Sequence, residues 1–319
     1  MNKVSIVIPC YCSEKSLPQV VERISNAMGR EDYELILVND ASPDNTFAVI
    51  TELAQKDNRI IGINLARNFG QHSAIFAGFH YASGDEIVCL DDDGQTPPEG
   101  IPSLLQAIRG EADVAYARYQ HKQHSLFRNF GSKVNDFMAR KLIEKPNDLF
   151  LSSFFAMKRY VMDEVLCYKN PFVYLPGLVL RSTNRICNVD IEHHAREHGR
   201  SGYTFGKLFK LWLNGFTAFS IKPLRVADFL GCFVAGWGFV YLIYTIVMYF
   251  YRPGTVAGWN SLMAVLLILG GSIMLMLGMI GEYLGRVYIS LNSAPQYVVR
   301  DVVRGNEEKI DQERGENWR

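Results

Sequence analysis

Two long apolar runs near the C-terminus constrain this chain more than any other feature. Residues 226–251 and 259–281 are almost entirely apolar or aromatic, and only a short segment joins them. A helix of roughly 25 residues reaches about 37 Å at 1.5 Å per residue, which is enough to cross a hydrocarbon core of about 30 Å. We therefore predict two transmembrane helices, joined as a hairpin, within 226–290. Two buried helices of a large soluble core are the alternative.

The charges that flank these runs predict their orientation. Basic residues lie before the first run and after the second, at Lys207, Lys210, Lys222, Arg225, Arg286 and Arg300. Only Arg252 lies between the runs. Because cytoplasmic flanks carry the excess of positive charge, we expect both termini and the soluble part on the cytoplasmic side of the inner membrane. The apolar run at the N-terminus is too short for a signal peptide.

Residues 203–225 are predicted to form a juxtamembrane helix. Aromatic residues and leucines recur there at helical spacing, and Lys207 and Lys210 lie off that stripe. Such a helix would lie along the membrane surface, although an ordinary helix packed on the soluble domain is also consistent with the pattern. Residues 291–319 are predicted to be a cytoplasmic tail, partly disordered because its end is charged and poor in apolar residues.

The segment 1–202 has the pattern of a soluble α/β domain. Predicted strands at 4–9, 33–38, 60–65 and 86–90 alternate with helical stretches near 17–28, 45–55 and 71–81. Apolar strands that alternate with helices are typical of a mostly parallel, Rossmann-like sheet covered on both faces. Ligands of such sheets bind at the carboxyl ends of the strands. Lysine plus arginine (33) balances aspartate plus glutamate (33), so the charge gives no indication of a nucleic-acid partner.

Acidic residues follow two of the predicted strands. Asp40 follows the second strand, and Asp91, Asp92 and Asp93 follow the fourth. Adjacent carboxylates repel one another, so they are tolerated mainly in solvent or around a cation. In an extended or turning chain, Asp91 and Asp93 would face one Mg²⁺ or Mn²⁺ while Asp92 points elsewhere; a solvated acidic turn is the alternative. Asp40 would bind a base or ribose hydroxyl, or cap the next helix, for which Asp44 is the better candidate.

Four segments recur in one order in a known family. They are Ile6–Tyr11, Val38–Ser42, Asn68–Gln71 and Leu90–Gln95. In this set the chain resembles family 2 glycosyltransferases of the GT-A fold. It is most similar to the polyprenyl-phosphate branch, which includes bactoprenol glucosyltransferases, undecaprenyl-phosphate aminoarabinose transferases and dolichol-phosphate mannose synthases. Arg196–Tyr203 resembles that branch's R-x-x-G-x-S-K-Y element, with Gly202 in place of the lysine.

The resemblance implies the residues of the site. The nucleotide-sugar would be bound by Pro9, Tyr11, Glu14, Asp40, Asn68, Gln71, Asp91 and Asp92, and the metal ion by Asp91 and Asp93. The implied catalytic residues are Asp93, Gln95, Arg118, Arg128, Arg196, Arg200 and Ser201. Without the resemblance, Arg118 or Arg128 would be interpreted as a surface charge and Gln95 as a turn residue.

One segment departs from the family pattern. Many relatives carry D-x-G-(C/F)-x-x-R before the membrane region, whereas this chain lacks the glycine, has Phe155 at the position of the arginine and has Asp148 offset by one. A base in this segment is therefore not assigned. A phosphate acceptor needs none, because a phosphate monoester is largely dianionic at pH 7 and can attack unaided.

The predicted reaction is an inverting transfer of a sugar from a nucleotide-sugar, with UDP favoured, to a polyprenyl phosphate, undecaprenyl phosphate in a bacterium. Mg²⁺ or Mn²⁺ is the implied cofactor. The membrane is a further partner, and a homo-oligomer is expected through glycines such as Gly270, Gly271 and Gly278. The alternative function is transfer to a hydroxyl of a glycan or a protein, which would require a general base.

Overall fold

The computed structural model describes residues 2–94, 96–119, 149–191, 258–291 and 295–305, together with eight positions between 233 and 251. The chain divides into two compact units. The first consists of Met1–Tyr203 and Ala294–Arg319, and the second of Thr204–Ser293.

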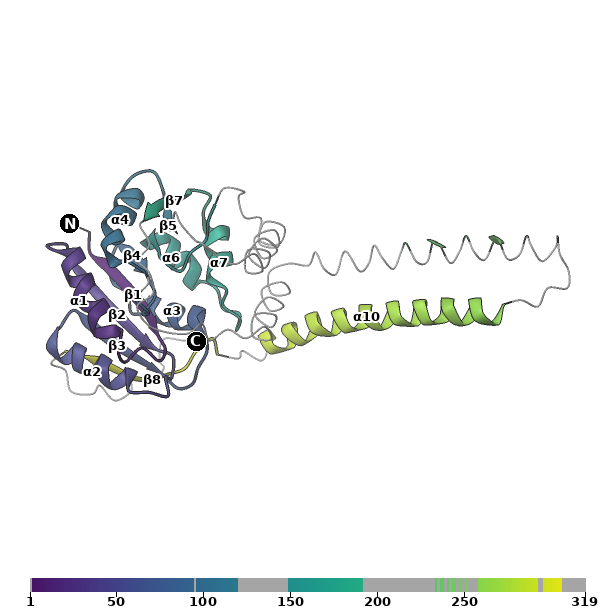
Figure 1. Ribbon diagram of the computed structural model, residues 1–319, viewed down its shortest axis with the longest axis horizontal. Helices are drawn as coiled ribbons and strands as arrows, with labels where there is room; N and C mark the ends of the chain where they lie inside the picture. The colour runs from purple at the N-terminus through teal and green to yellow at the C-terminus, as the bar shows by residue number, and fades with distance from the viewer. Residues whose placement is uncertain are drawn as a thin grey trace. The chain divides into compact units, whose positions relative to one another are not determined.

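In its described part, the first unit is built on one sheet with the strand order β7-β5-β6-β4-β1-β2-β3-β8 (Figure 1). The strands are β1 (Val4–Cys10), β2 (Tyr33–Asn39), β3 (Ile60–Leu65), β4 (Glu86–Cys89), β5 (Val114–Tyr119), β6 (Phe155–Lys158), β7 (Ile186–Ile191) and β8 (Val299–Arg304). β1 runs parallel to β2 and β4, β2 to β3, and β5 to β7. β6 pairs antiparallel with β4 and β5, and β8 pairs antiparallel with β3. The predicted mostly parallel sheet and its first four strands are confirmed.

Helices cover both faces of this sheet. They are α1 (Leu17–Met28), α2 (Thr46–Lys56), α3 (Gln71–Phe79), the short 3-10 helix η1 (Pro98–Gly100), α4 (Ile101–Arg109), α6 (Arg159–Leu166) and α7 (Leu175–Ser182). Side chains of α1, α2 and α4 pack with one face of the sheet in a single hydrophobic core. α3 and α6 contact the other face, where a Cβ on Gly78 of α3 would lie 2.5 Å from a methyl group of Val7. Glycine therefore lets α3 lie directly on β1. Because helices cover both faces of the sheet, the strands are buried on both sides and their sequences are mostly apolar.

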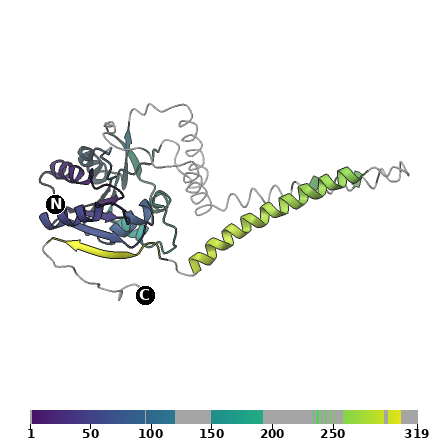
Figure 2. The same cartoon turned by 60° about the horizontal axis from the view of Figure 1, so that its bottom comes forward.

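The C-terminal strand closes one edge of the sheet. β8 lies along β3, with Asn64 opposite Asp301 in the ladder, and Figure 2 shows it in yellow at that edge. Just before β8, the Gln296 amide donates to the carbonyl oxygens of Tyr168 and Asn170, at 2.7 and 2.8 Å. The Tyr297 hydroxyl lies 2.9 Å from the Nδ1 atom of His80. Part of the segment that we predicted as a tail is therefore a strand of the first unit.

The second unit contains the long helix α10 (Trp259–Leu291). Its window Ile268–Gly285 has a mean hydropathy of 1.5 and is not buried, so this helix could cross a membrane by its length and composition. It begins where the second predicted span begins and continues to Leu291. Within the first predicted span, the described positions from Phe233 to Tyr251 are helical and exposed. The structure thus supports one candidate span, which corresponds to the second predicted run. The span predicted at 226–251 stays a prediction.

Candidate active site at the carboxyl edge of the sheet

Loops after β1, β2, β3 and β4 meet at one edge of the sheet. The backbone N–H of Tyr11, after β1, donates to the Asp92 carboxylate after β4, at 2.9 Å. The Asn68 amide, after β3, donates to the carbonyl oxygen of Asp40 after β2, at 3.2 Å. Since these strands are parallel, their carboxyl ends meet here, and the acidic residues predicted from the sequence lie in one region.

Asp91 is held from two sides. The Gln71 amide, at the start of α3, donates to one carboxylate oxygen at 2.7 Å, and the Ser153 hydroxyl donates to the other. Burial raises the pKa of Asp91 to about 6; the Ser153 hydrogen bond opposes this shift, and the neighbouring charges of Asp93 and Asp92 add to it. A carboxylate so constrained has a fixed direction, which suits a ligand of a cation.

The two following aspartates differ in their surroundings. Asp92 turns back to the β1 loop through its hydrogen bond with the Tyr11 backbone. Burial raises the pKa of Asp92, and hydrogen bonds with Ser13 and the Tyr11 backbone oppose that shift. Asp93 is exposed at the tip of the loop. Asp92 therefore ties two loops together, and Asp91 and Asp93 remain the pair that the sequence predicts as ligands of one ion.

The donor set fits Mg²⁺ or Mn²⁺ only with help from a substrate. Among the residues described here, no three His, Cys, Asp or Glu side chains are arranged to hold a metal ion. Mg²⁺ commonly binds one or two carboxylates together with water and substrate phosphates, so Asp91 and Asp93 would suffice beside a diphosphate. The ion would then neutralise the charge that develops on the diphosphate leaving group.

Asp40 organises the loop that precedes α3. It is 4% exposed, and its two carboxylate oxygens accept hydrogen bonds from the backbone N–H groups of Phe69 and Gly70, at 2.7 and 2.8 Å. Burial raises the pKa of Asp40, and these two N–H groups act against the shift. Asp44 accepts hydrogen bonds from the backbone N–H and the hydroxyl of Thr46, the first residue of α2, whereas the N-cap position itself is Asn45. Asp40 is thus fixed in place by the loop that precedes α3, in the region where we predicted nucleotide binding from the sequence.

The β1 loop presents the other residues assigned to the nucleotide. Pro9 is buried near the end of β1, and Tyr11 is 51% exposed. The Glu14 carboxylate accepts a hydrogen bond from the Asn45 backbone N–H at 3.2 Å, which ties the loop to the start of α2. The exposed Tyr11 ring is a surface on which a base could stack, because aromatic rings stack on any base.

Arg118 has a carboxylate partner on the sheet itself. It lies on β5, and its guanidinium forms two hydrogen bonds with Asp190 of β7, at 2.6 and 3.0 Å. A phosphate group at Arg118 would have to compete with that ion pair. The other predicted catalytic residues Gln95, Arg128, Arg196, Arg200 and Ser201 lie outside the described residues.

A group of hydroxyls beside Asp91 was missed by the sequence analysis. β6 is antiparallel to β4 and pairs Phe155 with Cys89, so Ser153 lies across from Asp91. Burial raises the pKa of Tyr119, and its hydrogen bonds with Thr96 and Ser152 oppose that shift. The sequence signal that could have revealed this group is the pair Ser152 and Ser153, which lies in the segment compared with the family's D-x-G-(C/F)-x-x-R pattern.

Phe155, at the position of the family's arginine, belongs to the core. It is 3% exposed, and its ring centroid lies 5.3 Å from that of Tyr116. At the position where many relatives have an arginine, this protein therefore has a residue that packs in the core. The polar groups of this segment are the hydroxyls of Ser152 and Ser153, which precede β6.

We expect Ser153→Ala to weaken Mn²⁺ binding about tenfold, because the Asp91 carboxylate loses one of the groups that orient it. Ser153→Thr keeps the hydroxyl and should restore most of the affinity. Titration of the full chain with Mn²⁺ in the presence of UDP measures both variants. Equal affinity for the wild type and Ser153→Ala would show that Gln71 alone orients Asp91.

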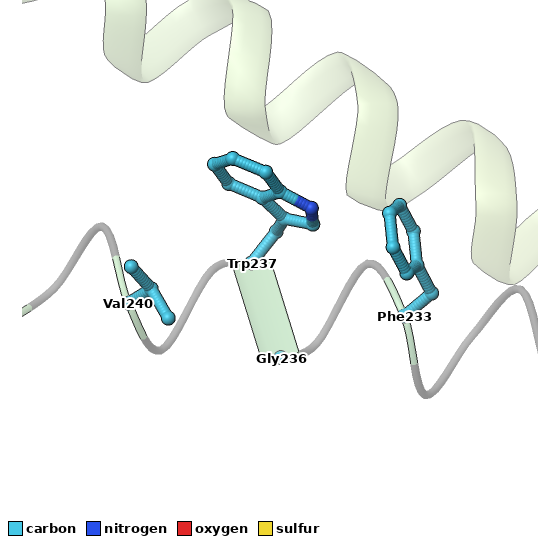
Figure 3. A pocket seen from close by; sticks show the side chains of 4 residues that line it. All are labelled: Phe233, Gly236, Trp237 and Val240. Carbon is cyan, nitrogen blue, oxygen red and sulfur yellow. The ribbon is translucent and has the colours of Figure 1, made fainter.

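An apolar recess lies in the second unit. Phe233, Gly236, Trp237 and Val240 line about 430 Å³ of open space, and Figure 3 shows their side chains along one helical stretch. The four described residues that line this recess carry no charged or hydroxyl group.

The fold is similar to that of solved structures of one enzyme. Glucosyl-3-phosphoglycerate synthase from Mycobacterium tuberculosis in complex with Mn²⁺ and UDP-glucose superposes with a TM-score of 0.52 at 17% identity, over 69% of this chain and 79% of that one. The same enzyme in complex with UDP also gives a TM-score of 0.52 at 17% identity, over 68% and 79%. At this identity the likeness concerns the fold, which is GT-A-like.

Sequence relatives extend over nearly the whole chain. Undecaprenyl-phosphate 4-deoxy-4-formamido-L-arabinose transferase of Proteus mirabilis is 36% identical over 95% of this chain and 94% of that protein. The enzyme of the same name from Photorhabdus laumondii is 35% identical over 98% of both chains.

The first unit thus has a GT-A-like sheet with acidic residues at its carboxyl edge. Residues 5–166 match Glycosyl transferase family 2, and residues 222–287 match the GtrB C-terminal hairpin. The chain belongs to glycosyl transferase family 2, and it is a glycosyltransferase.

Proposed function

We propose that this enzyme transfers a sugar from a nucleoside diphosphate sugar to undecaprenyl phosphate and so makes a lipid-linked sugar. The observation that carries this proposal is the extent of the likeness to transferases named for that lipid, which covers 95% of the chain. It includes the region that matches a C-terminal hairpin as well as the sheet unit. An acceptor with a long polyprenyl tail is reached most directly by an enzyme held at the membrane.

The site geometry supports a division of roles. Asp91 and Asp93 would hold Mg²⁺ or Mn²⁺ against the diphosphate, with Gln71 and Ser153 fixing the direction of Asp91. Pro9, Tyr11 and Asp40 stand on the β1 and β2 side, where a nucleotide would lie. UDP is the favoured nucleotide, because solved structures with this fold hold Mn²⁺ with UDP-glucose.

The chemical step that we propose is a single displacement with inversion at the anomeric carbon. An oxygen of the acceptor phosphate forms the new bond to that carbon while the bond to the diphosphate breaks. The acceptor oxygen carries no proton that must be removed, since a phosphate monoester is largely dianionic at pH 7. The protein then has to hold two anionic partners together and offset their repulsion, which is a task of positioning and electrostatics.

The position of β8 supports two crossings of the membrane. β8 follows α10 in the chain, yet it pairs with β3 of the first unit. A folded sheet lies on one side of a bilayer, so the segment between Tyr203 and Ala294 must cross an even number of times. If α10 is one crossing, a second is required, and the basic flanks support our proposal that the sheet and both termini lie in the cytoplasm.

Sugar transfer in purified membranes tests this function. Radiolabelled UDP-, GDP- and dTDP-sugars would be offered with undecaprenyl phosphate and Mg²⁺ or Mn²⁺. We expect metal-dependent label in the lipid fraction from one donor. Label on a soluble saccharide or a protein, with none in the lipid fraction, would contradict the proposal and move the acceptor to a hydroxyl.

A further inference from the structure

We propose that Asp301 of β8, the strand that follows the hairpin segment, is a positioning residue of the donor site. It orients a chain of hydrogen bonds that holds the loops after β1 and β2, to which we assign the nucleotide. The inference rests on the proposed nucleoside diphosphate donor and adds a positioning residue that lies more than 200 positions away from those loops in sequence, since Asp301 and Asn64 are separated by 237 residues.

The hydrogen bonds form one continuous path across three strands. The Asn64 amide of β3 donates to the Asp301 carboxylate at 2.8 Å, and the Asn39 amide of β2 donates to the Asn64 side-chain oxygen at 2.8 Å. The Asn39 side-chain oxygen accepts the Ser42 backbone N–H at 3.2 Å. Finally, the Ser42 hydroxyl oxygen accepts the Cys12 backbone N–H at 3.1 Å. We call this path the Asp301 relay.

The two ends of the relay determine the direction of the amides between them. An ionised carboxylate such as Asp301 can only accept, and a backbone N–H such as that of Ser42 can only donate. Asn64 must therefore turn its NH₂ group to Asp301 and its oxygen to Asn39. Asn39 is then left with its oxygen facing Ser42. Without the carboxylate, only the Ser42 N–H still selects this direction, so the half-turned arrangement, in which that N–H faces an NH₂ group, is disfavoured at one end of the relay instead of at both.

The loops at the far end of the relay have backbone conformations that need such support. Ala41 and Cys12 have φ angles of 52° and 56°, a region that side-chain-bearing residues rarely adopt. Ala41 lies between Asp40 and Ser42, and Cys12 follows Tyr11, so these two residues set the path of the segments that we assign to the nucleotide. Asn39 is 3% exposed, which makes an unpaired amide there costly.

β8 is held to the sheet independently of the Asp301 side chain. Its backbone pairs with β3 from Arg304 to Val299, and the Gln296 and Tyr297 contacts fix the segment before it. The Asp301 carboxylate also lies 3.8 Å from the Nε atom of its neighbour Arg300, an exposed contact. Removal of the carboxylate should therefore disturb the relay and leave the strand in place.

The test measures nucleotide binding to the full-length chain in detergent with Mn²⁺, for Asp301→Ala, Asp301→Asn and the control Arg304→Ala on the same strand. We expect Asp301→Ala to weaken UDP binding and raise the donor KM about three- to tenfold, the equivalent of one hydrogen bond, with kcat unchanged. Asp301→Asn keeps an accepting oxygen and should stay within about twofold of the wild type. Arg304→Ala should bind as the wild type does.

A double variant adds a second measure. Asn64→Ala with Asp301→Ala should bind UDP no more weakly than Asn64→Ala alone, because both changes interrupt one path. The relay would be overturned if Asp301→Ala bound UDP as tightly as the wild type. It would also be overturned if the loss of UDP affinity simply followed the drop in Tm in all three single variants. Neither outcome would affect the proposed donor. If the wild type bound none of UDP, GDP and dTDP, the proposed donor would be wrong and the relay's role would fall with it.

Discussion

Asp93→Ala is expected to reduce sugar transfer by about 10²- to 10³-fold in kcat. Asp93 stands exposed at the tip of the loop after β4, next to Asp91, which is half-buried and held by Gln71 and Ser153. If both carboxylates hold the ion, loss of one removes much of the charge stabilisation on the leaving diphosphate, and an interaction made in the transition state is lost from kcat. The measurement is the initial rate of label transfer to the lipid fraction at saturating donor and Mn²⁺.

Two matched variants give this result its meaning. Asp92→Asn retains an oxygen that can accept the Tyr11 N–H, so its rate should fall much less than that of Asp93→Ala. Asp163→Asn changes an exposed aspartate of α6 that lies 3.8 Å from Arg159, and it should leave the rate unchanged. A rate for Asp93→Ala within about threefold of the wild type would show that Asp93 is a solvated turn residue, since one catalytic carboxylate contributes far more than that.

Asp40→Ala is expected to lower the free energy of unfolding by about 2–4 kcal/mol and to abolish most donor binding. The substitution leaves the partly buried backbone N–H groups of Phe69 and Gly70 without their partner, and an unsatisfied donor that is buried costs about 1–3 kcal/mol. The loop that begins α3 with Gln71 would then lose its position, and Asp91 would lose a fixed contact. Denaturant unfolding and UDP titration measure the two effects.

Asp44→Asn is the control for that experiment. It lies in the same loop and accepts the Thr46 groups through a single oxygen, which an asparagine also has. Its stability and its UDP affinity should stay near those of the wild type. Unchanged UDP binding in Asp40→Ala, at a temperature where the variant is folded, would remove Asp40 from the donor site.

The predictable parts of this protein have local causes. The strands β1 to β4 follow from β-branched and apolar runs, which fix an extended and buried chain regardless of distant partners. The acidic residues could be placed at one edge because parallel strands have a common direction, and Asp40 and Asp91 are indeed found there. The start of α10 followed from the length and composition of its apolar run.

The features that escaped prediction depend on pairing between distant segments. Ser153 faces Asp91 only because β6 pairs antiparallel with β4 in a particular register, and the sequence of β6 is equally compatible with other registers. β8 joins β3 across the whole hairpin segment, which no local periodicity reveals. Arg118 faces Asp190 for the same reason, because β5 and β7 are aligned by the sheet.

By itself the sequence determined where strands, acidic loops and apolar helices occur, because these depend on neighbouring residues and on simple periodicities. Only the tertiary structure decided that the Ser153 hydroxyl contacts Asp91 and that the Asp301 carboxylate contacts Asn64. A hydrogen bond is specific to within a few tenths of an ångström, and such a distance is set by strand order and register rather than by composition.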